Sequence, residues 1–541
     1  MISRKTKIIL LSLLLLYFVL NLFFVCRYYN KETLFNCYSI EQFRDARNDY
    51  AENICIGTRI VLSYSPLDFK MPIVDNFMAR PLNGPFYYFI ASVLKSFGYS
   101  GSLIFPLQMV NLIFSCLALL FIFLSLFKLS NNLTASLIGV LLVAFSFCFW
   151  YWGTSVKSYP ITTAFLFLSI YLLLFSRWHL TLLSGIFMAL AAGFTFTAVI
   201  IMPVAITFFF LQKLPAFKKL FHCMIFLVVS FFLIFLIHSL SYWMYFKMEN
   251  FSFALSHSSK MLTWTGYNAS STLDIKRLQE ASADGKIQIL RTQMERLWRR
   301  FSEMSILPIF AKGDRLYSFA PLQEVVKFVF KSAGVIFAVI IILSIFFIKG
   351  WKQNFFFCLP AFFWVSIPLL IFFIADADND YTYIAAFGLI FFITAASSFS
   401  RILRVALILW ISLIAFVNIL VVYPVSREDT NQMLMESKRV AEKIKTGTQF
   451  AYFDPNFSQR GEDIYLAYYS RAKMRIILPY MENKFPLNSN EIVVNQSELE
   501  HYPCVPEEVK KSFVDFLRKS GYKETDNFFL GENTFAVYKK K

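Results

Sequence analysis

The sequence predicts a polytopic α-helical membrane protein with about eleven transmembrane helices, followed by a C-terminal extracytoplasmic α/β domain. Two observations carry this prediction. Of the 541 residues, 57% are hydrophobic and only 16% are charged, which is far from the balance of a soluble globular domain. Apolar runs of about 20 residues, the length that crosses roughly 30 Å of hydrocarbon, recur throughout residues 1–423.

The first apolar run is preceded by Arg4, Lys5 and Lys7 and is followed by no small-residue cleavage site. We therefore interpret it as an uncleaved anchor with a cytoplasmic N-terminus. In the stretch 180–212 the sequence leaves room for only a very tight turn between two spans. The eleven predicted spans are 8–26, 104–127, 133–151, 159–176, 180–196, 197–212, 220–241, 332–348, 354–374, 381–399 and 403–423.

Basic residues in the short connections predict the orientation. Threaded from a cytoplasmic N-terminus, the chain puts these connections on the cytoplasmic side, and together with the N-terminal three they hold twelve Lys or Arg and no acidic residue. All 35 Asp and Glu then fall on the other face. This distribution satisfies the positive-inside rule at each such connection. We expect an integral protein of a bacterial cytoplasmic (inner) membrane. The basic segments are Lys128, Arg177, Lys213–Lys219, Lys349–Lys352 and Arg401–Arg404.

The predicted organisation is a multi-span membrane domain, 1–423, with outer loops at 27–100 and 242–331, followed by a soluble α/β domain, 424–541. In the first loop, "CYSIEQFRDARNDYAENI" predicts an amphipathic helix, and "ARPLNGPFYYFIASVLKSFGY" predicts a turn and then an aromatic helix too short to span. The second loop contains "KIQILRTQMERLWRRFSEM", whose apolar spacing predicts a helix along the membrane surface.

The tail alternates helical and strand-like patterns. Helices are predicted from "NQMLMESKRVAEKIKTG" and from "PEEVKKSFVDFLRKSGY", which begins with proline and acidic residues and ends in glycine. Short strands are predicted from "FAYFDP", "MRIILPY" and "EIVVNQS", and an edge strand from "NTFAVYKKK".

Lys157, in "WYWGTSVKSYP", is the exception among the short connections because the threading puts it on the outer side. Two interpretations are open. A lysine at a span end can simply extend its ammonium group to the lipid head groups. Alternatively it forms an anion site at the membrane surface, where it binds phosphate as a point charge and Tyr159 adds a hydroxyl donor.

For two acidic segments on the outer side, a solvated and a functional interpretation are likewise both open. In "IADADNDYTY" the Asp residues form a solvated turn, or one carboxylate such as Asp380 faces the same cavity as Lys157, with Tyr381 or Tyr383 lining it. In the first loop the carboxylates face water, or one of them acts as a general base on a hydroxyl. The candidates there are Glu41, Asp45, Asp49 and Glu52.

The order of elements resembles the bacterial GT-C glycosyltransferases, the relatives of protein O-mannosyltransferases and of the aminoarabinose transferase that modifies lipid A. The resemblance covers roughly residues 1–423. It rests on an anchor, a long acidic first outer loop ending in an element similar to "PPLYYLL", and the stretches "LQMVNLIFSCLALLFIFLSLFKL", "FWYWGTSVKSYPITTAFLFLSIYLLL", "ALAAGFTFTAVIIMPVAITFFFL" and "DNDYTYIAAFGLIFFITAAS".

The resemblance implies transfer of a sugar from a polyprenyl-phosphate carrier to an acceptor hydroxyl, with inversion, on the extracytoplasmic face. It implies a first-loop carboxylate as base, with cationic and tyrosine residues holding the phosphate leaving group. Carried over, Lys157 and Tyr159 match the family's charged residue followed by tyrosine, and Arg80–Pro81 matches its His-Pro. Either Tyr381 or Tyr383 matches the late tyrosine.

The chain departs from the family at the catalytic acid, because Tyr38 stands where an Asp is expected. The nearest replacements are Glu41 and Asp45, with Asp49, Asp68 and Asp75 in reserve. A chain with the scaffold but a lost base is therefore an alternative.

The other function classes are less well supported by the sequence. A net charge of +17 is spread over membrane flanks and loops without a basic arm, so we expect no nucleic-acid partner. No Cys/His spacing predicts a metal, and we expect no cofactor beyond the lipid-linked sugar donor. A transporter or flippase for a lipid-linked saccharide would show charges near the membrane midplane. A non-catalytic scaffold remains the third alternative. The acceptor is a glycolipid, a polysaccharide or a protein.

Overall fold

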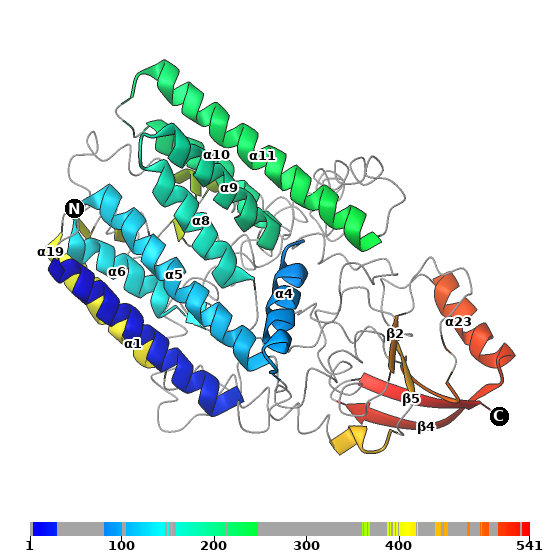
Figure 1. Cartoon of the computed structure of the whole chain (residues 1–541). Helices are drawn as coiled ribbons and strands as arrows, with labels where there is room; N and C mark the ends of the chain where they lie inside the picture. Colours follow the sequence, from blue (N-terminus) through cyan, green and yellow to red (C-terminus); the bar gives the residue numbers. More distant parts are fainter. Residues whose placement is uncertain are drawn as a thin grey trace.

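The structure is a computed structural model of the whole chain (Figure 1). It describes residues 4–29, 81–99, 104–146, 158–210, 214–246, 400–417, 439–444, 448–452, 473–476, 489–496, 507–530 and 533–540, with scattered positions between them. The predicted surface helix in the 242–331 loop and the predicted span 332–348 lie outside the described residues, apart from Arg291.

Helices dominate the described part of residues 1–423, as the sequence predicts (Figure 1). Three of them are long and apolar enough to cross a membrane, at Thr6–Cys26, Phe105–Ser130 and Ala216–Leu240. The described helices are α1 (Arg4–Tyr29), α4 (Asn83–Ser96), α5 (Ile104–Ser130), α6 (Leu133–Ala144), α8 (Tyr159–Leu173), α9 (Trp178–Phe194), η3 (Phe196–Ile200), α10 (Ile201–Phe210), α11 (Ala216–Phe246) and α19 (Arg401–Val417).

Several helices are shorter than the predicted spans. The span predicted at 133–151 begins as expected, where Asn132 caps α6 by accepting a hydrogen bond from the Ala135 amide at 3.1 Å. However, α6 ends at Ala144, and the Ser146 hydroxyl turns back to the Val143 carbonyl at 2.8 Å. The apolar run continues past this point, which is why hydropathy alone does not detect the helix end.

The predicted tight turn within 180–212 is present. The α9 helix ends at Phe194, Thr195 takes an extended backbone with φ −153° and ψ 107°, and η3 starts at Phe196. The α10 helix then returns to the end of the bundle at which α9 begins. There the side-chain amide of Gln212, just after α10, donates a hydrogen bond to the carbonyl of Leu173 at the end of α8. The two segments therefore run in opposite directions.

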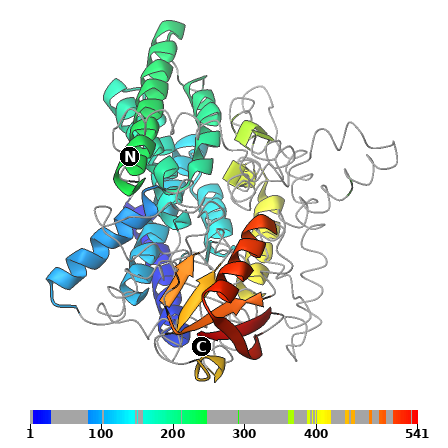
Figure 2. The ribbon, with the colours of Figure 1, turned by 90° about the vertical axis from the view of Figure 1, so that its right-hand side faces the viewer.

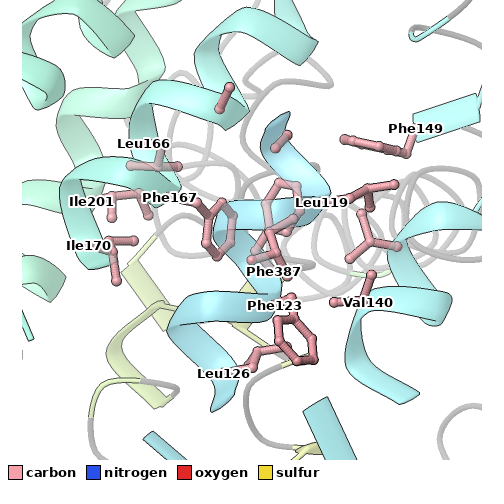
Figure 3. Packing of buried hydrophobic residues seen from close by; sticks show 14 of the residues in the cluster. Leu119, Phe123, Leu126, Val140, Phe149, Leu166, Phe167, Ile170, Ile201 and Phe387 are labelled. Carbon is pink, nitrogen blue, oxygen red and sulfur yellow. The ribbon is translucent and has the colours of Figure 1, made fainter. Parts of the chain in front are cut away.

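Hydrogen bonds and apolar contacts together hold the bundle. Ser169 and Ser184 exchange hydrogen bonds between α8 and α9, each hydroxyl donating to the other residue's carbonyl, at 2.9 and 2.8 Å. Around them lies one large cluster of buried apolar side chains drawn from most of the helices, part of which Figure 3 shows. Phe167 on α8 stacks edge-on against Phe387 at 5.0 Å between ring centroids, which ties the C-terminal part of the membrane region to the N-terminal helices (Figure 3).

The basic connections gather at one end of the bundle, which we call the basic end and define by Lys128, Arg177, Lys218 and Lys219. The Lys128 ammonium lies 4.9 Å from the centre of the Phe175 ring, in the connection between α8 and α9. The Lys219 ammonium contacts the carbonyl of Phe210 at 3.2 Å. No Asp or Glu occurs in residues 76–248, so these charges have no acidic neighbour from that stretch. The orientation predicted from the positive-inside rule requires these basic connections to lie at the same end of the bundle, as they do.

The short helix α4 confirms the prediction of an aromatic helix that cannot span. Its 14 residues measure about 21 Å at 1.5 Å per residue, less than the hydrocarbon thickness. It ends in a turn around Gly98, whose φ of 78° favours glycine, and the Tyr99 amide there donates to the Leu94 carbonyl at 3.0 Å. Figure 2 shows α4 leaving the side of the helical bundle near the start of α5.

The described part of the tail forms a five-stranded mixed sheet in the order β2-β1-β3-β5-β4. The strands β1, β2 and β3 are parallel, whereas β5 pairs antiparallel with both β3 and β4. The helix α23 (Glu507–Lys519) lies beside this sheet (Figure 2). Its Phe513 and Leu517 are buried in one cluster with Ile492, Val494 and their neighbours. The strands are β1 (Gln449–Tyr452), β2 (Lys473–Ile476), β3 (Glu491–Asn495), β4 (Tyr522–Leu530) and β5 (Asn533–Lys540).

One prediction for the tail is wrong. The sequence "NTFAVYKKK" was expected to form an edge strand, but β5 lies inside the sheet, and β4 beside it forms the edge. Buried Phe535 and Ala536 show that β5 carries core residues despite its lysine-rich end. The boundary at 424 and the extracytoplasmic side of this part stay predictions.

Candidate functional site

The candidate site lies at the end of the bundle opposite the basic end, at the interruption between α9 and η3. We call residues Gly193–Phe196 the α9 break. Three other helices contact it, namely α4, α8 and α11. The chain therefore brings together segments that are more than a hundred residues apart in sequence.

The start of α4 docks directly on the α9 break. The Leu82 amide donates to the Gly193 carbonyl at 2.9 Å. A Cβ atom on residue 193 would lie 2.5 Å from Cδ1 of Leu82, so glycine is needed for this close approach. The Phe86 ring meets the Phe194 ring edge-on at 5.3 Å. Buried Pro81 precedes this contact and leads the chain into it.

The first turn of α8 contacts the break through hydroxyl groups. The Thr195 oxygen accepts a hydrogen bond from the Thr162 hydroxyl at 2.9 Å and lies 3.1 Å from the Ser158 oxygen, while its own hydrogen goes to the Phe194 carbonyl at 2.8 Å. The Thr195 hydroxyl group has a hydroxyl neighbour at each of its two lone pairs and donates its own hydrogen, so its hydrogen-bonding capacity is fully used. All three hydroxyl side chains are buried. Ser158 stands at the N-cap position of α8 but makes no capping bond there.

The α11 helix contributes an imidazole. The His238 ring meets the Phe196 ring edge-on, with centroids 5.2 Å apart. His238 is 4% exposed, and its Nε2 has no hydrogen-bond partner among the described residues. The neighbouring Ser239 hydroxyl is also buried and unpartnered within the described part of the chain. Burying such a group without a partner costs about 1–3 kcal/mol, so each requires a reason.

The start of α5 adds two amide side chains near α4. The Tyr87 hydroxyl donates to Asn111 Oδ1 at 2.7 Å, and the Phe86 ring meets the Phe114 ring at 5.9 Å. Gln108, one turn before Asn111, is 1% exposed, and its Oε1 finds no partner among the residues described. The two amide side chains of α5 thus lie at the end where α4 docks.

Of the residues predicted from the sequence for the site, the structure describes Tyr159. It occupies the first turn of α8, directly after Ser158, and is 5% exposed within the large apolar cluster. Its carbonyl accepts the Thr163 hydroxyl at 2.7 Å. The remaining predicted residues lie outside the described residues, namely Glu41, Asp45, Asp49, Arg80, Lys157, Asp380, Tyr381 and Tyr383.

Sequence reasoning missed Thr195, His238 and Ser239. A signal for His238 was present, because a histidine within the apolar run "FLIFLIHSLSYW" is a functional candidate by default in a membrane span. Thr195 carried no such signal, since its role depends on contacts with Ser158 and Thr162, more than thirty positions away.

The described groups can bind but cannot supply a base of carboxylate type. Hydroxyl, imidazole and amide groups at the α9 break suit an oxygen-rich ligand, whereas the described part of residues 1–423 contains no Asp or Glu. The described residues also contain no cluster of three or more His, Cys, Asp or Glu that could hold a metal ion.

A scan against protein-family models finds no match, and a search of curated proteins finds no significant one. Among solved structures the chain is similar to the oligosaccharyltransferase of Archaeoglobus fulgidus in complex with Zn and sulfate. The identity is 13%, the TM-score is 0.44, and the match covers 97% of this chain and 72% of that one.

The chain is also similar to ArnT from Cupriavidus metallidurans. In the form bound to undecaprenyl phosphate the identity is 9% and the TM-score 0.39, and in the apo form they are 10% and 0.36. Both matches cover 99% of this chain and 98% of the other. These proteins are GT-C glycosyltransferases, the class that the sequence pattern resembles.

Proposed function

We propose that the chain is a membrane glycosyltransferase that transfers a sugar from a polyprenyl-phosphate donor to an acceptor hydroxyl, on the extracytoplasmic face and with inversion. The acceptor is a glycolipid, a polysaccharide or a protein. The sequence pattern of residues 1–423 motivates the proposal. The single structural observation that supports it most is the convergence of α4 and α8 on the α9 break.

Chain connectivity gives this convergence its chemical meaning. Lys157 directly precedes Ser158, which contacts Thr195, and Arg80 stands two positions before Leu82, which is bonded to Gly193. In the proposal these two cations, as chain neighbours of the described contacts, bind the donor phosphate at the α9 break. A guanidinium such as that of Arg80 can bind phosphate in a bidentate manner, and the Lys157 ammonium binds it as a point charge.

In the proposed reaction an oxygen of the acceptor attacks the anomeric carbon from the face opposite the donor phosphate. The bond between that carbon and the phosphate oxygen breaks, the phosphate leaves with the electron pair, and the acceptor proton passes to a carboxylate. The configuration at the carbon inverts. Lys157 and Arg80 stabilise the charge that develops on the leaving phosphate, an interaction that is stronger in the transition state than before reaction. Tyr159 and either Tyr381 or Tyr383, with Asp380, are proposed to complete the substrate site.

The base in this proposal comes from the first outer loop. No Asp or Glu occurs between Asp75 and Glu249, so the helices around the α9 break cannot provide one from that stretch. Glu41, Asp45 and Asp49 are the candidates, and a positioned base contributes about 10²–10⁴-fold to the rate.

A transfer assay with purified protein and labelled undecaprenyl-phosphate sugars tests the proposal. We expect Lys157→Gln to lower the rate about 10²–10³-fold. Lys128→Gln, a matched loss of charge at the basic end, should leave the rate unchanged. Among Glu41→Gln, Asp45→Asn and Asp49→Asn, the variant that lacks the base should lose activity, whereas the other two should retain it.

Two results would contradict the proposed activity, and a third would contradict the proposed site. If wild-type protein moves labelled lipid across vesicle membranes without transferring sugar, the chain is a flippase. If neither transfer nor movement occurs and all three carboxylates can be neutralised without consequence for the cell, the scaffold alternative holds. Equal losses in the Lys157 and Lys128 variants would remove the α9 break from the mechanism.

A further inference from the structure

His238 differs from Thr195 at the α9 break in the hydrogen bonds that its side chain makes. Thr195 is saturated by Ser158, Thr162 and the Phe194 carbonyl. By contrast, His238 Nε2 is buried and has no partner among the described residues. A ligand that enters at the α9 break could supply the missing hydrogen bond once the surrounding side chains make room for it.

A second histidine on the same helix provides an internal comparison. His222, four turns earlier on α11, is buried to a similar degree, at 6% against 4% exposed. Its Nδ1 lies 2.7 Å from the Thr181 hydroxyl, so its polarity is matched by a neighbouring helix. His222 is at the basic end, whereas His238 is at the α9 break. On α11, His222 is thus hydrogen-bonded to a neighbouring helix, whereas Nε2 of His238 has no such bond among the described residues.

The hydroxyl groups of the bundle show the same contrast. Serines inside these helices normally donate to a carbonyl one turn back, as Ser115 does to Asn111 at 2.9 Å and Ser412 to Ile408 at 2.9 Å. Ser239 makes no such bond among the residues that the structure describes, and it adjoins His238. Two consecutive buried polar side chains without a partner among the described residues, on an otherwise apolar helix, favour a ligand-binding role over a packing role.

We propose that Nε2 of His238 hydrogen-bonds the polar head of the lipid-linked sugar donor at the α9 break. This inference rests on the function proposed above and adds a substrate-binding residue to it. Depending on its tautomer, a neutral imidazole donates from Nε2 to a phosphate oxygen or accepts from a sugar hydroxyl. The edge-on contact with Phe196 fixes the ring beside the residues that precede η3.

The test compares three variants of the full-length protein in lipid nanodiscs. His238→Leu removes the hydrogen bond, His238→Gln retains a nitrogen near the position of Nε2, and His222→Leu is the matched control. The measurements are the affinity for undecaprenyl phosphate, the affinity for undecaprenyl-phosphate hexose, and Tm without ligand.

We expect His238→Leu to weaken binding about tenfold without lowering Tm, because an apolar replacement leaves no buried group without a partner. His238→Gln should bind within a few-fold of wild type. His222→Leu should lower Tm, since it removes the hydrogen bond between Thr181 on α9 and His222 on α11, and should leave binding unchanged. Weakened binding of both lipids would identify the phosphate as the partner of Nε2, and weakened binding of the hexose lipid alone would identify the sugar.

Three outcomes would overturn the inference. His238→Leu could bind both lipids as tightly as wild type, or lower Tm without affecting binding, or lose both properties without recovery in His238→Gln. In each case the wild-type protein still binds, so the proposed function survives. If wild-type protein binds neither lipid and transfers no sugar, the proposed function and the inference fail together.

Discussion

The Tyr87 hydroxyl donates a hydrogen bond of 2.7 Å to Oδ1 of Asn111, and both side chains are completely buried. This bond links α4, which is too short to span the membrane, to the first turns of α5. It fixes α4 beside the α9 break, and it does so with polar atoms in an otherwise aromatic contact. The bond gives the first prediction.

We expect Tyr87→Phe to destabilise the protein by about 1–3 kcal/mol, because Asn111 Oδ1 stays buried after losing this donor. Asn111→Leu should cost a similar amount. The double variant should cost less than the sum, since neither partner then remains without the other. Thermal unfolding of the purified protein measures each value, and Ser96→Ala at the exposed end of α4 is the control. Additive losses would show that the two side chains do not depend on each other.

The close contact between Gly193 and Leu82 gives a second prediction, which concerns steric overlap. In Gly193→Ala the new Cβ would lie 2.5 Å from Leu82 Cδ1, while the backbone bond between the residues prevents them from separating. We expect a loss of about 1–3 kcal/mol from overpacking. Adding Leu82→Ala should recover part of that loss.

Gly98→Ala is the comparison for this pair. Its positive φ makes alanine unfavourable, but no atom lies within 4 Å of the new Cβ. Leu82→Ala should therefore not rescue it. If Leu82→Ala helped both glycine variants equally, the close contact at Gly193 would not be the cause of the loss.

The orientation of the bundle is tested by two matched substitutions, Ser92→Cys on α4 and Ser176→Cys between α8 and α9. Both serines are exposed, and they lie at opposite ends of the bundle. In a cysteine-free background, a membrane-impermeant maleimide should label residue 92 in intact spheroplasts and residue 176 only after permeabilisation. The reverse pattern would invert the orientation and move the α9 break to the cytoplasmic side.

The exposed apolar stripe of α4 predicts contact with lipid. Phe89, Val93 and Phe97 recur at helical spacing and are 65%, 36% and 86% exposed. Because α5 begins a few residues later, we expect this stripe to lie at the bilayer surface. Spin labels at these positions should be relaxed more by oxygen than by a water-soluble nickel complex, and a label at Ser92 should show the opposite. Preferential relaxation by nickel at all four positions would contradict the membrane contact.

The central position of β5 gives a prediction for the tail. Ala536 pairs with Val494 on one side and Asn527 on the other, so Ala536→Pro should cost about 3 kcal/mol or more and disrupt the sheet. Thr525→Pro, at the irregularity in edge strand β4, should be tolerated better. Limited proteolysis of the full chain should lose a resistant C-terminal fragment only in the Ala536 variant. Equal resistance of both variants would contradict the observed strand order.

The order of the helices could be predicted because two independent signals agree. Apolar length identifies the helices, and residues such as Lys128 and Arg177 identify the end at which each connection lies. Helix ends within an apolar run could not be predicted in this way. The α6 helix stops at Ala144 through a local turn at Ser146, and hydropathy does not change there.

The tail shows a different limit of sequence reasoning. The segment "YKETDNFFL" is rich in residues that are uncommon in strands, yet it forms β4 because β5 provides a complete row of partners. Overlooking β4 is what made β5 look like an edge. For the site, the sequence indicated single residues such as Lys157. It could not indicate the α9 break, which depends on contacts between Leu82, Ser158 and Gly193–Thr195.

The exchange of hydrogen bonds between Ser169 and Ser184 has a consequence for how the chain enters the bilayer. The α8 and α9 helices measure about 22 and 26 Å, less than a typical hydrocarbon core. Taken singly, each would carry a serine hydroxyl into lipid and would be shorter than the hydrocarbon core. As a hairpin the two satisfy each other's polar groups. We therefore expect the insertion machinery to release them together, so that their pairing precedes assembly of the bundle.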